Sequence, residues 1–366
     1  MTDRAVRLHL TNIAGAGATQ LLMSLLPALE RNADVRIAEM ALPAHGQLST
    51  YRPAPSVRVV VYRRFLPNAL SRLLECTLFA GRFSGAPALL VLGDLPLRCR
   101  ASQTVFVQTP HLTSPTDSAR RDGRLKFMIA RWVFRINAGR AHSFIVQTPV
   151  MRTALARTYP AIADRIHIVA QPVPGWLQEA GLKRRGRARP EDPKLSLAYP
   201  AALYPHKNHA LLGTLGQQTT DAWPVGDLTL TIPPARHPAP GLPWIKCVGI
   251  LSPAEMVALY QRIDALLFLS TDESYGFPLI EAMFVGLPIV CPDLPYAHTL
   301  CGDGAIYFDP RSASSLREAL QLLRWRLNNG WWPDWSAQNA AIPRDWDAVA
   351  RSMLTIATGP VAPEWA

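Results

Sequence analysis

The chain has 366 residues, of which 49% are apolar and 18% are charged. This apolar fraction excludes a disordered or low-complexity protein, and the length predicts two domains. The 38 lysines and arginines exceed the 27 acids by 11, which favours an anionic partner: nucleic acid, a phosphate-bearing substrate or an acidic membrane surface. Because no long stretch is both apolar and free of charge, we expect no membrane-spanning helix.

Five cysteines stand at positions 76, 99, 247, 291 and 301, without a C-x-x-C pair. This pattern predicts neither a disulfide framework nor a zinc site, and it favours reduced thiols in the cytoplasm. The chain starts with Arg4 and Arg7 ahead of an apolar stretch, as a signal peptide would. Because polar residues and glycines interrupt that stretch, we expect no signal peptide.

The first 170 residues alternate between short apolar runs and helical patterns. This alternation is typical of a parallel sheet with helices on both faces, so we expect an N-terminal Rossmann-like domain over residues 1–172. Strands are expected at 6–12, 35–40, 57–62, 88–93, 104–108, 143–147 and 166–170.

Residues 173–194 break the alternation, because they are rich in proline, glycine and cations. We expect an exposed basic linker there, with its cations in solvent. The alternation then resumes, and it predicts a second Rossmann-like domain over 195–335. Strands are expected at 195–201, 227–232, 244–250, 264–270, 287–293 and 305–310. An amphipathic helix at 342–357 lies in the expected C-terminal segment, 336–366.

The start of one helix in the second domain can be placed closely. Ser252 is expected to be its N-cap, Pro253 its first residue and Glu255 the partner that completes a capping box.

The strongest functional signal is the segment Glu273-Ser-Tyr-Gly-Phe-Pro-Leu-Ile-Glu281, which follows an apolar strand. Gly276 allows a ligand to approach the backbone, and Phe277 and Pro278 open a helix whose free N–H groups attract an anion. Doubly wound folds bind their ligands at the carboxyl ends of such strands. Glu273 and Glu281 are therefore candidates to hold hydroxyl groups of a phosphate-bearing ligand.

This segment carries a family resemblance. Together with GLPIVCPDLPYA (286–297) and GDGAIYFDP (302–310), it resembles the donor-binding half of glycosyltransferase family 4, a family of GT-B fold. YPAALYPHKNHALL (199–212) is similar to that family's phosphate-binding segment, and FIVQTPVMRTAL (144–155) resembles the end of its first domain. The resemblance implies an α/β protein of two Rossmann-like, doubly wound domains that face a central cleft, with a C-terminal helix that crosses back to the first domain.

The resemblance also implies a function. Family members transfer a sugar, here a hexose, from a nucleotide-sugar to a hydroxyl with retention, and the expected pathway is bacterial surface polysaccharide or glycolipid synthesis. Glu281 would hold the ribose, Glu273 the donor sugar, and Lys207 would neutralise the diphosphate. No metal and no cofactor besides the donor substrate are expected, and the acceptor would be a glycan or lipid-linked glycan. The expected location is the cytoplasm, at the inner face of the plasma membrane.

The chain departs from the family at one position. The family usually has an arginine five residues before the lysine, and this chain has Ala202 there. A second cation for the diphosphate would come from His206, Arg236 or a helix N-terminus, or is dispensed with. Gly249 and Ile250, at the end of the strand expected at 244–250, complete the candidate donor contacts.

Two candidates lie in the first domain. Gly15 and Gly17 follow the first strand, where they could cradle a diphosphate or make a tight turn, and a third glycine of G-x-G-x-x-G is absent. His111 follows a strand end, where a histidine near the donor sugar and a structural histidine are both consistent with the pattern.

The only D-x-D pair, Asp345 and Asp347, lies at the start of the last expected helix. We interpret these acids as partners of the helix dipole and not as metal ligands, so no metal site is expected. The basic helix at 124–140 has two interpretations: contact with an anionic membrane, or an ordinary helix with Met128, Trp132 and Ile136 on the core. The pattern favours the second.

Two other function classes compete with glycosyl transfer. The net charge of +11 suggests nucleic-acid binding, but no helix-turn-helix or zinc pattern accompanies it, so we expect no nucleic-acid partner. A non-catalytic nucleotide-sugar sensor or a dinucleotide-dependent enzyme would share the tandem Rossmann plan, and turnover with a panel of donors separates these from a transferase.

Overall fold

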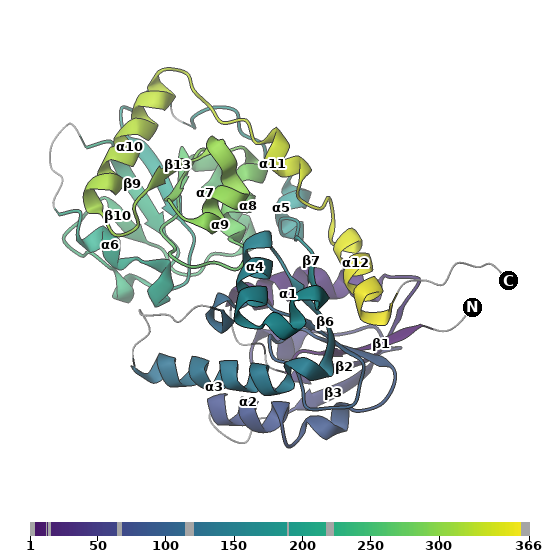
Figure 1. Ribbon diagram of the computed structural model, residues 1–366. Helices are drawn as coiled ribbons and strands as arrows, with labels where there is room; N and C mark the ends of the chain where they lie inside the picture. The colour runs from purple at the N-terminus through teal and green to yellow at the C-terminus, as the bar shows by residue number, and fades with distance from the viewer. Residues whose placement is uncertain are drawn as a thin grey trace. The chain divides into compact units, whose positions relative to one another are not determined.

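The computed structural model describes residues 4–11, 13, 16–63, 68–113, 121–188, 190–216 and 223–359. It divides into two compact units: unit 1 consists of residues 1–172 and 343–366, and unit 2 of residues 173–342. Figure 1 shows the helices and strands of both. The division follows from the sequence, since each unit has its own set of apolar strands and its own buried core.

Unit 1 is built on a seven-stranded parallel sheet in the order β3-β2-β1-β4-β5-β6-β7. The strands are β1 (Ala5–His9), β2 (Arg36–Pro43), β3 (Arg58–Tyr62), β4 (Ala88–Val91), β5 (Gln103–Phe106), β6 (Ala141–Val146) and β7 (Ile166–Ile168). The helices are α1 (Ala16–Glu30), α2 (Asn68–Cys76), α3 (Arg121–Asn137), α4 (Pro149–Thr158) and α12 (Trp346–Thr358). All seven strands expected from the apolar runs are confirmed.

Unit 2 has a six-stranded parallel sheet in the order β10-β9-β8-β11-β12-β13. Its strands are β8 (Leu195–Tyr199), β9 (Val225–Leu230), β10 (Ile245–Cys247), β11 (Ala265–Leu267), β12 (Ile289–Pro292) and β13 (Ile306–Phe308). Its helices are α5 (Gly175–Ala180), α6 (Ala210–Gly213), α7 (Pro253–Arg262), α8 (Phe277–Val285), α9 (Pro295–Cys301), α10 (Ala313–Asn328) and α11 (Ser336–Ala340). The central strands are buried on both faces, as a sheet between two helix layers requires.

Local signals place several helix ends. The capping box is confirmed: Ser252 Oγ accepts from the Glu255 N–H, and Glu255 Oε2 accepts from the Ser252 N–H at 2.7 Å. Asp345 caps α12 by accepting from the N–H of Ala348, and Asp347 pairs with Arg31 at 2.7 Å. The two acids of the D-x-D therefore serve the helix start and an ion pair within unit 1.

The last helix returns to the first unit. Its buried residues, among them Val349, Ala350 and Met353, follow a helical period, and α12 packs on α1 (Figure 1). The segment before it, α11, stays with unit 2, where Asn339 Nδ2 donates to the carbonyl of Met283. No helix in the described part of the chain is both long and apolar enough to span a bilayer.

The basic segment 173–194 differs from the exposed linker expected of it, because it packs within unit 2. Arg184 donates from Nη1 to the carbonyls of Tyr260, Gln261 and Ile263, at the carboxyl end of α7. Its backbone N–H donates to the carbonyl of Val285, where α8 ends. The unpaired carbonyls at helix ends attract cations, and this attraction holds the segment on the unit.

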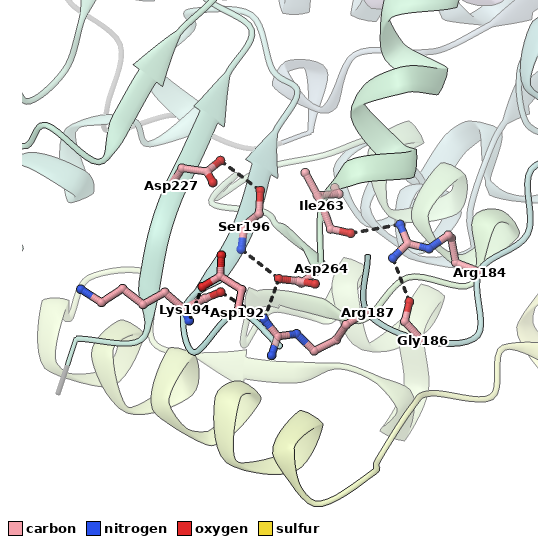
Figure 2. A network of polar contacts seen from close by, with 9 residues as sticks. All are labelled: Arg184, Gly186, Arg187, Asp192, Lys194, Ser196, Asp227, Ile263 and Asp264. Atoms are coloured by element: carbon pink, nitrogen blue, oxygen red, sulfur yellow. Dashed lines mark hydrogen bonds and ion pairs between the residues drawn. The ribbon is translucent and has the colours of Figure 1, made fainter. Parts of the chain in front are cut away.

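A second arginine of this segment is buried in an ion pair. Figure 2 shows Asp264 between Arg187 and the backbone of Ser196. Asp264 Oδ2 accepts from Arg187 Nη2 at 3.2 Å and from the Ser196 N–H at 3.0 Å. The Arg187 and Asp264 side chains are only 8% and 3% exposed, so this cation is not in solvent.

Candidate functional site

The candidate site lies at the carboxyl edge of the sheet in unit 2. Strands β8 and β11 are neighbours there, although their first residues are 70 positions apart along the chain. The connections from these two strands lead to opposite sides of the sheet, which makes their carboxyl ends the topological switch point. The loop after β8 carries Lys207, and the loop after β11 carries Glu273.

Lys207 and Glu273 form an ion pair across this switch point, between Nζ and Oε1. Their side chains are 15% and 11% exposed, so the pair is largely shielded from water. The backbone holds it in place: the carbonyl of His206 accepts from the Thr271 N–H at 2.7 Å, and Tyr199 Oη donates to the carbonyl of Lys207 at 2.8 Å. The structure therefore brings together two residues that the sequence placed 66 positions apart.

A second acid stands beside the pair. Burial and then the charge of Glu273 raise the pKa of Asp272 to about 6, and Lys207 acts in the opposite direction. The group thus contains one ammonium and two carboxyls at a strand end. Such a site can balance the charge of an anion on the lysine and accept hydrogen bonds from hydroxyl groups on the carboxylates.

The N-terminus of α8 belongs to the same loop. Gly276 adopts φ 84, a left-handed conformation, and an added Cβ would lie 3.3 Å from Leu279 Cδ1. Pro278 takes the first turn, and the rings of Tyr275 and Phe277 meet edge to face with centroids 5.1 Å apart. The helix thus starts four residues after Glu273. In its first turn Pro278 has no N–H and the Leu279 N–H donates to the Gly276 carbonyl at 2.9 Å, so the positive end of the helix dipole faces this edge mainly through Phe277.

Glu281 is buried in the second turn of α8 and is 8% exposed. The hydroxyl of Tyr260, in α7, donates to Glu281 Oε2 at 2.6 Å. Burial raises the pKa of Glu281 to about 7, although this hydrogen bond lowers it. Sequence reasoning missed Tyr260; the available signal was a tyrosine at a core-facing helical position, whose hydroxyl needs a partner.

The remaining candidates of unit 2 lie in loops at the same edge. His206 stacks on Tyr204 with ring centroids 5.7 Å apart, and Ala202 is exposed. Arg236 follows β9 and is exposed. Gly249 adopts φ 81 after β10, and Ile250 is 92% exposed.

Another histidine close to Lys207 in the chain, His209, does not supply a second cation. His209 is buried against the Tyr199 ring, and burial lowers its pKa to about 4. It is therefore neutral at pH 7.

The candidates of the first domain belong to unit 1. His111 follows β5 and its ring lies on Phe127, 4.2 Å between centroids; burial and then Lys126 and Arg131 lower its pKa. Gly17 lies in the first turn of α1, and an added Cβ there would meet nothing within 4 Å. Gly15 lies outside the described residues. In the described residues no group of three or more His, Cys, Asp and Glu side chains could hold a metal ion.

Comparison with known proteins identifies what this edge resembles. Residues 244–324, which contain Glu273 and Glu281, match the family model "Glycosyl transferases group 1". The O-antigen chain mannosyltransferase RfbU of Salmonella typhimurium is 36% identical over 67 residues, or 18% of this chain and 19% of that protein. O-antigen chain mannosyltransferase B of Escherichia coli is 28% identical over 87 residues, 23% of each chain. The chain thus spans about a fifth of the length of these curated relatives.

Solved structures share the fold over nearly the whole chain. A sucrose-phosphate synthase from Thermosynechococcus elongatus superposes with a TM-score of 0.65 at 15% identity, covering 96% of this chain and 97% of its own. WaaG, a glycosyltransferase involved in lipopolysaccharide biosynthesis, gives 0.62 at 13% identity, covering 97% and 100%. Together with the two parallel sheets, these likenesses establish the α/β fold of the GT-B class.

Proposed function

We propose that this chain is a glycosyltransferase that moves a hexose from a nucleotide-sugar to a hydroxyl of a glycan or lipid-linked glycan. The observation that carries the proposal is the shielded Lys207–Glu273 ion pair at the switch point of unit 2. It pairs a cation suited to a diphosphate with a carboxylate suited to sugar hydroxyls, next to a helix N-terminus. The match of residues 244–324 to group 1 glycosyl transferases supports the same chemistry.

The proposed roles follow the positions of the side chains. Lys207 neutralises the diphosphate, which departs with the electron pair of the sugar–oxygen bond. The acceptor oxygen bonds to the same sugar carbon, and the proton of the acceptor hydroxyl passes to the departing phosphate oxygen. Glu273 orients the donor sugar through its hydroxyls. Glu281 holds the ribose, and Tyr260 positions the Glu281 carboxyl through their hydrogen bond. We assign the chain to the family 4 type, which implies retention at the transferred carbon.

We further propose that the reaction needs no metal and no cofactor besides the donor. Lys207 and the positive end of the α8 dipole provide the positive potential that a metal would supply at the diphosphate. His111 is proposed to act near the donor sugar, and the loop with Gly15 and Gly17 to contact the donor diphosphate or the acceptor.

The relatives suggest the sugar and the pathway. Because two of them are O-antigen chain mannosyltransferases, we propose mannose as the first sugar to test and a bacterial surface polysaccharide as the product. A cytoplasmic location suits this role, and it agrees with the five cysteines, which form no disulfide, since disulfides are rare in that compartment.

A donor screen tests the proposal. The protein is heated with UDP-, GDP-, ADP- and dTDP-sugars, and a donor at 100 times its dissociation constant stabilises the fold by about 2.7 kcal/mol. The donor that shifts the transition is then incubated with candidate acceptors, and sugar transfer is measured for wild type and Glu273→Gln. We expect one nucleotide class to bind and the variant to bind it with greatly reduced turnover. Binding without transfer by the wild type to any acceptor would favour a non-catalytic sensor.

A further inference from the structure

Helix α3 has two apolar faces, and only one of them packs on the core of unit 1. Val133 and Phe134 are fully buried. Leu125, Met128, Trp132 and Ile136 recur every three or four residues and are 56%, 56%, 53% and 42% exposed. The interpretation of Met128, Trp132 and Ile136 as core-facing is therefore wrong: the helix already fills its core contact with other residues.

The neighbouring helix widens this exposed surface. α2 packs beside α3 (Figure 1). At its two ends stand Leu70, 49% exposed, and Leu78 and Phe79, 72% and 48% exposed. We call the α2/α3 patch the exposed set Leu70, Leu78, Phe79, Leu125, Met128, Trp132 and Ile136. Single exposed apolar residues are ordinary, but large ones grouped on adjacent helices mark an interaction surface.

The exposed charges on the two described segments that carry the patch, 70–83 and 125–140, have one sign. Arg82, Lys126, Arg135 and Arg140 are exposed. The only acid among the described side chains of 70–83 and 125–140 is Glu75, and it is 0% exposed. The surface therefore combines apolar side chains with cations and offers no exposed carboxylate within these segments.

We propose that the α2/α3 patch docks on the surface of an anionic lipid bilayer, with α3 lying in the plane of the interface. A helix with an exposed apolar stripe, a tryptophan and flanking cations suits the boundary between acyl chains and acidic headgroups. A second copy of the chain is a poorer occupant, because a symmetric contact places the same patch on both sides and sets cations against cations.

This inference goes beyond glycosyl transfer and is tested without it. Purified protein is sedimented with vesicles of phosphatidylcholine alone or mixed with phosphatidylglycerol, in the absence of any donor or acceptor. We expect binding to the anionic vesicles at least about tenfold tighter than to the neutral ones, and weaker binding as salt rises. Equal or absent binding to both vesicle types would overturn the proposal.

Substitutions within the patch locate the contact. Met128→Glu/Trp132→Glu should lower the partition to anionic vesicles at least about tenfold, and Lys126→Gln and Arg135→Gln should each lower it about fivefold. The matched control is Trp325→Glu, since Trp325 is 63% exposed on α10 of unit 2. We expect this control to bind as wild type does.

Thermal unfolding of each variant confirms that the fold is intact, and Trp132→Ser serves as the milder change if the double variant unfolds. Two results would contradict a bilayer contact. One is wild-type partition for Met128→Glu/Trp132→Glu. The other is a wild-type dimer in sedimentation velocity that the same variant converts to a monomer, since a second copy would then cover the patch.

Discussion

The hydroxyl of Tyr260 donates to Oε2 of Glu281 at 2.6 Å, which links α7 to α8 beneath the candidate donor site. Because burial raises the pKa of Glu281 to about 7, this carboxyl changes charge within the physiological range. A protonated carboxyl can accept fewer hydrogen bonds from ribose hydroxyls than a carboxylate can. The pair thus couples the proposed nucleotide binding to pH.

Donor affinity should therefore rise with pH. In the wild type, we expect the affinity for an intact nucleotide-sugar to increase between pH 6 and pH 8 with a midpoint near 7, by up to about tenfold, the value of one hydrogen bond to a charged group. Glu281→Gln should bind weakly and without this dependence. Calorimetric titration at several pH values measures both. An identical pH profile for the two proteins would assign the titration to another group.

Removing the tyrosine hydroxyl should move that midpoint. The hydrogen bond from Tyr260 lowers the pKa of Glu281, so Tyr260→Phe should raise it further. The pH profile of donor affinity should shift to higher pH, while affinity well above the new midpoint recovers. Tyr204→Phe is the control, because Tyr204 is exposed and stacks on His206. A lower midpoint in Tyr260→Phe would contradict the assigned role.

The raised pKa of Glu281 should also make the free energy of unfolding depend on pH. Its folded pKa of about 7 lies above its ordinary value of 4.5, so the native state holds a proton that the unfolded state releases between these values. Its contribution to the free energy of unfolding is complete below pH 4.5 and is lost as pH rises through 7, by on the order of 3 kcal/mol. Glu281→Gln lacks this loss. In urea unfolding, the free energy of unfolding of wild type relative to that of the variant should fall from pH 5 to pH 8. Equal changes in the two proteins would contradict the raised pKa of Glu281.

The expected strands agree with the structure within a few residues because the inner strands of each parallel sheet are buried on both faces and appear as uninterrupted apolar runs. The contact between Lys207 and Glu273 could not be predicted from the sequence in the same way. Each loop could be placed after its strand, but their adjacency depends on β8 lying beside β11. Strand order is a property of the whole sheet, which spacing along the chain does not encode.

Two other features could not be predicted from the sequence, for physical reasons. Arg184 lies in a segment whose proline, glycine and charge content is typical of exposed loops, and only the folded unit shows the α7 carbonyls that it binds. On α3, both apolar faces satisfy a helical period, so periodicity could not decide which face, that of Val133 or that of Trp132, meets the core.

Arg184 should matter for folding. Its guanidinium donates to three carbonyls at the end of α7, so Arg184→Ala leaves them without this cation and should lower the free energy of unfolding by about 2–3 kcal/mol. Arg185 is the matched control, since it is the next residue and is exposed; Arg185→Ala should change stability by less than about 0.5 kcal/mol. Chemical denaturation measures both free energies of unfolding. Equal losses of stability in the two variants would mean that the lost net charge is responsible, and not the hydrogen bonds of Arg184 to the α7 carbonyls.

Chelation should leave the activity intact. If Lys207 and the α8 N-terminus carry the charge at the diphosphate, sugar transfer should proceed in EDTA at the rate seen without it. The control is a full donor titration with and without chelator, which separates weaker binding from slower turnover. Complete loss in EDTA with recovery in magnesium or manganese would show that a metal takes part.

Lys207 gives the sharpest test of the site. Negative charge grows on the leaving diphosphate as the sugar–oxygen bond breaks, so a fixed cation stabilises the transition state more than the bound donor. Lys207→Ala should lower kcat by roughly 10²–10³-fold with a smaller effect on donor affinity, and Lys207→Arg should retain more activity. Because Ala202 stands where the family that this segment resembles usually has an arginine, we expect the lysine to carry more of this role.

Truncation of Lys207 also leaves Glu273 without its ion-pair partner in a shielded site, which by itself destabilises the fold. The double variant Lys207→Ala/Glu273→Gln removes that unpaired charge and should recover stability without recovering turnover. A double variant that regained activity would show that the lysine serves the fold alone. Near-normal turnover of Lys207→Ala would place the diphosphate elsewhere on this edge, and Arg236, exposed after β9, would be the next residue to remove.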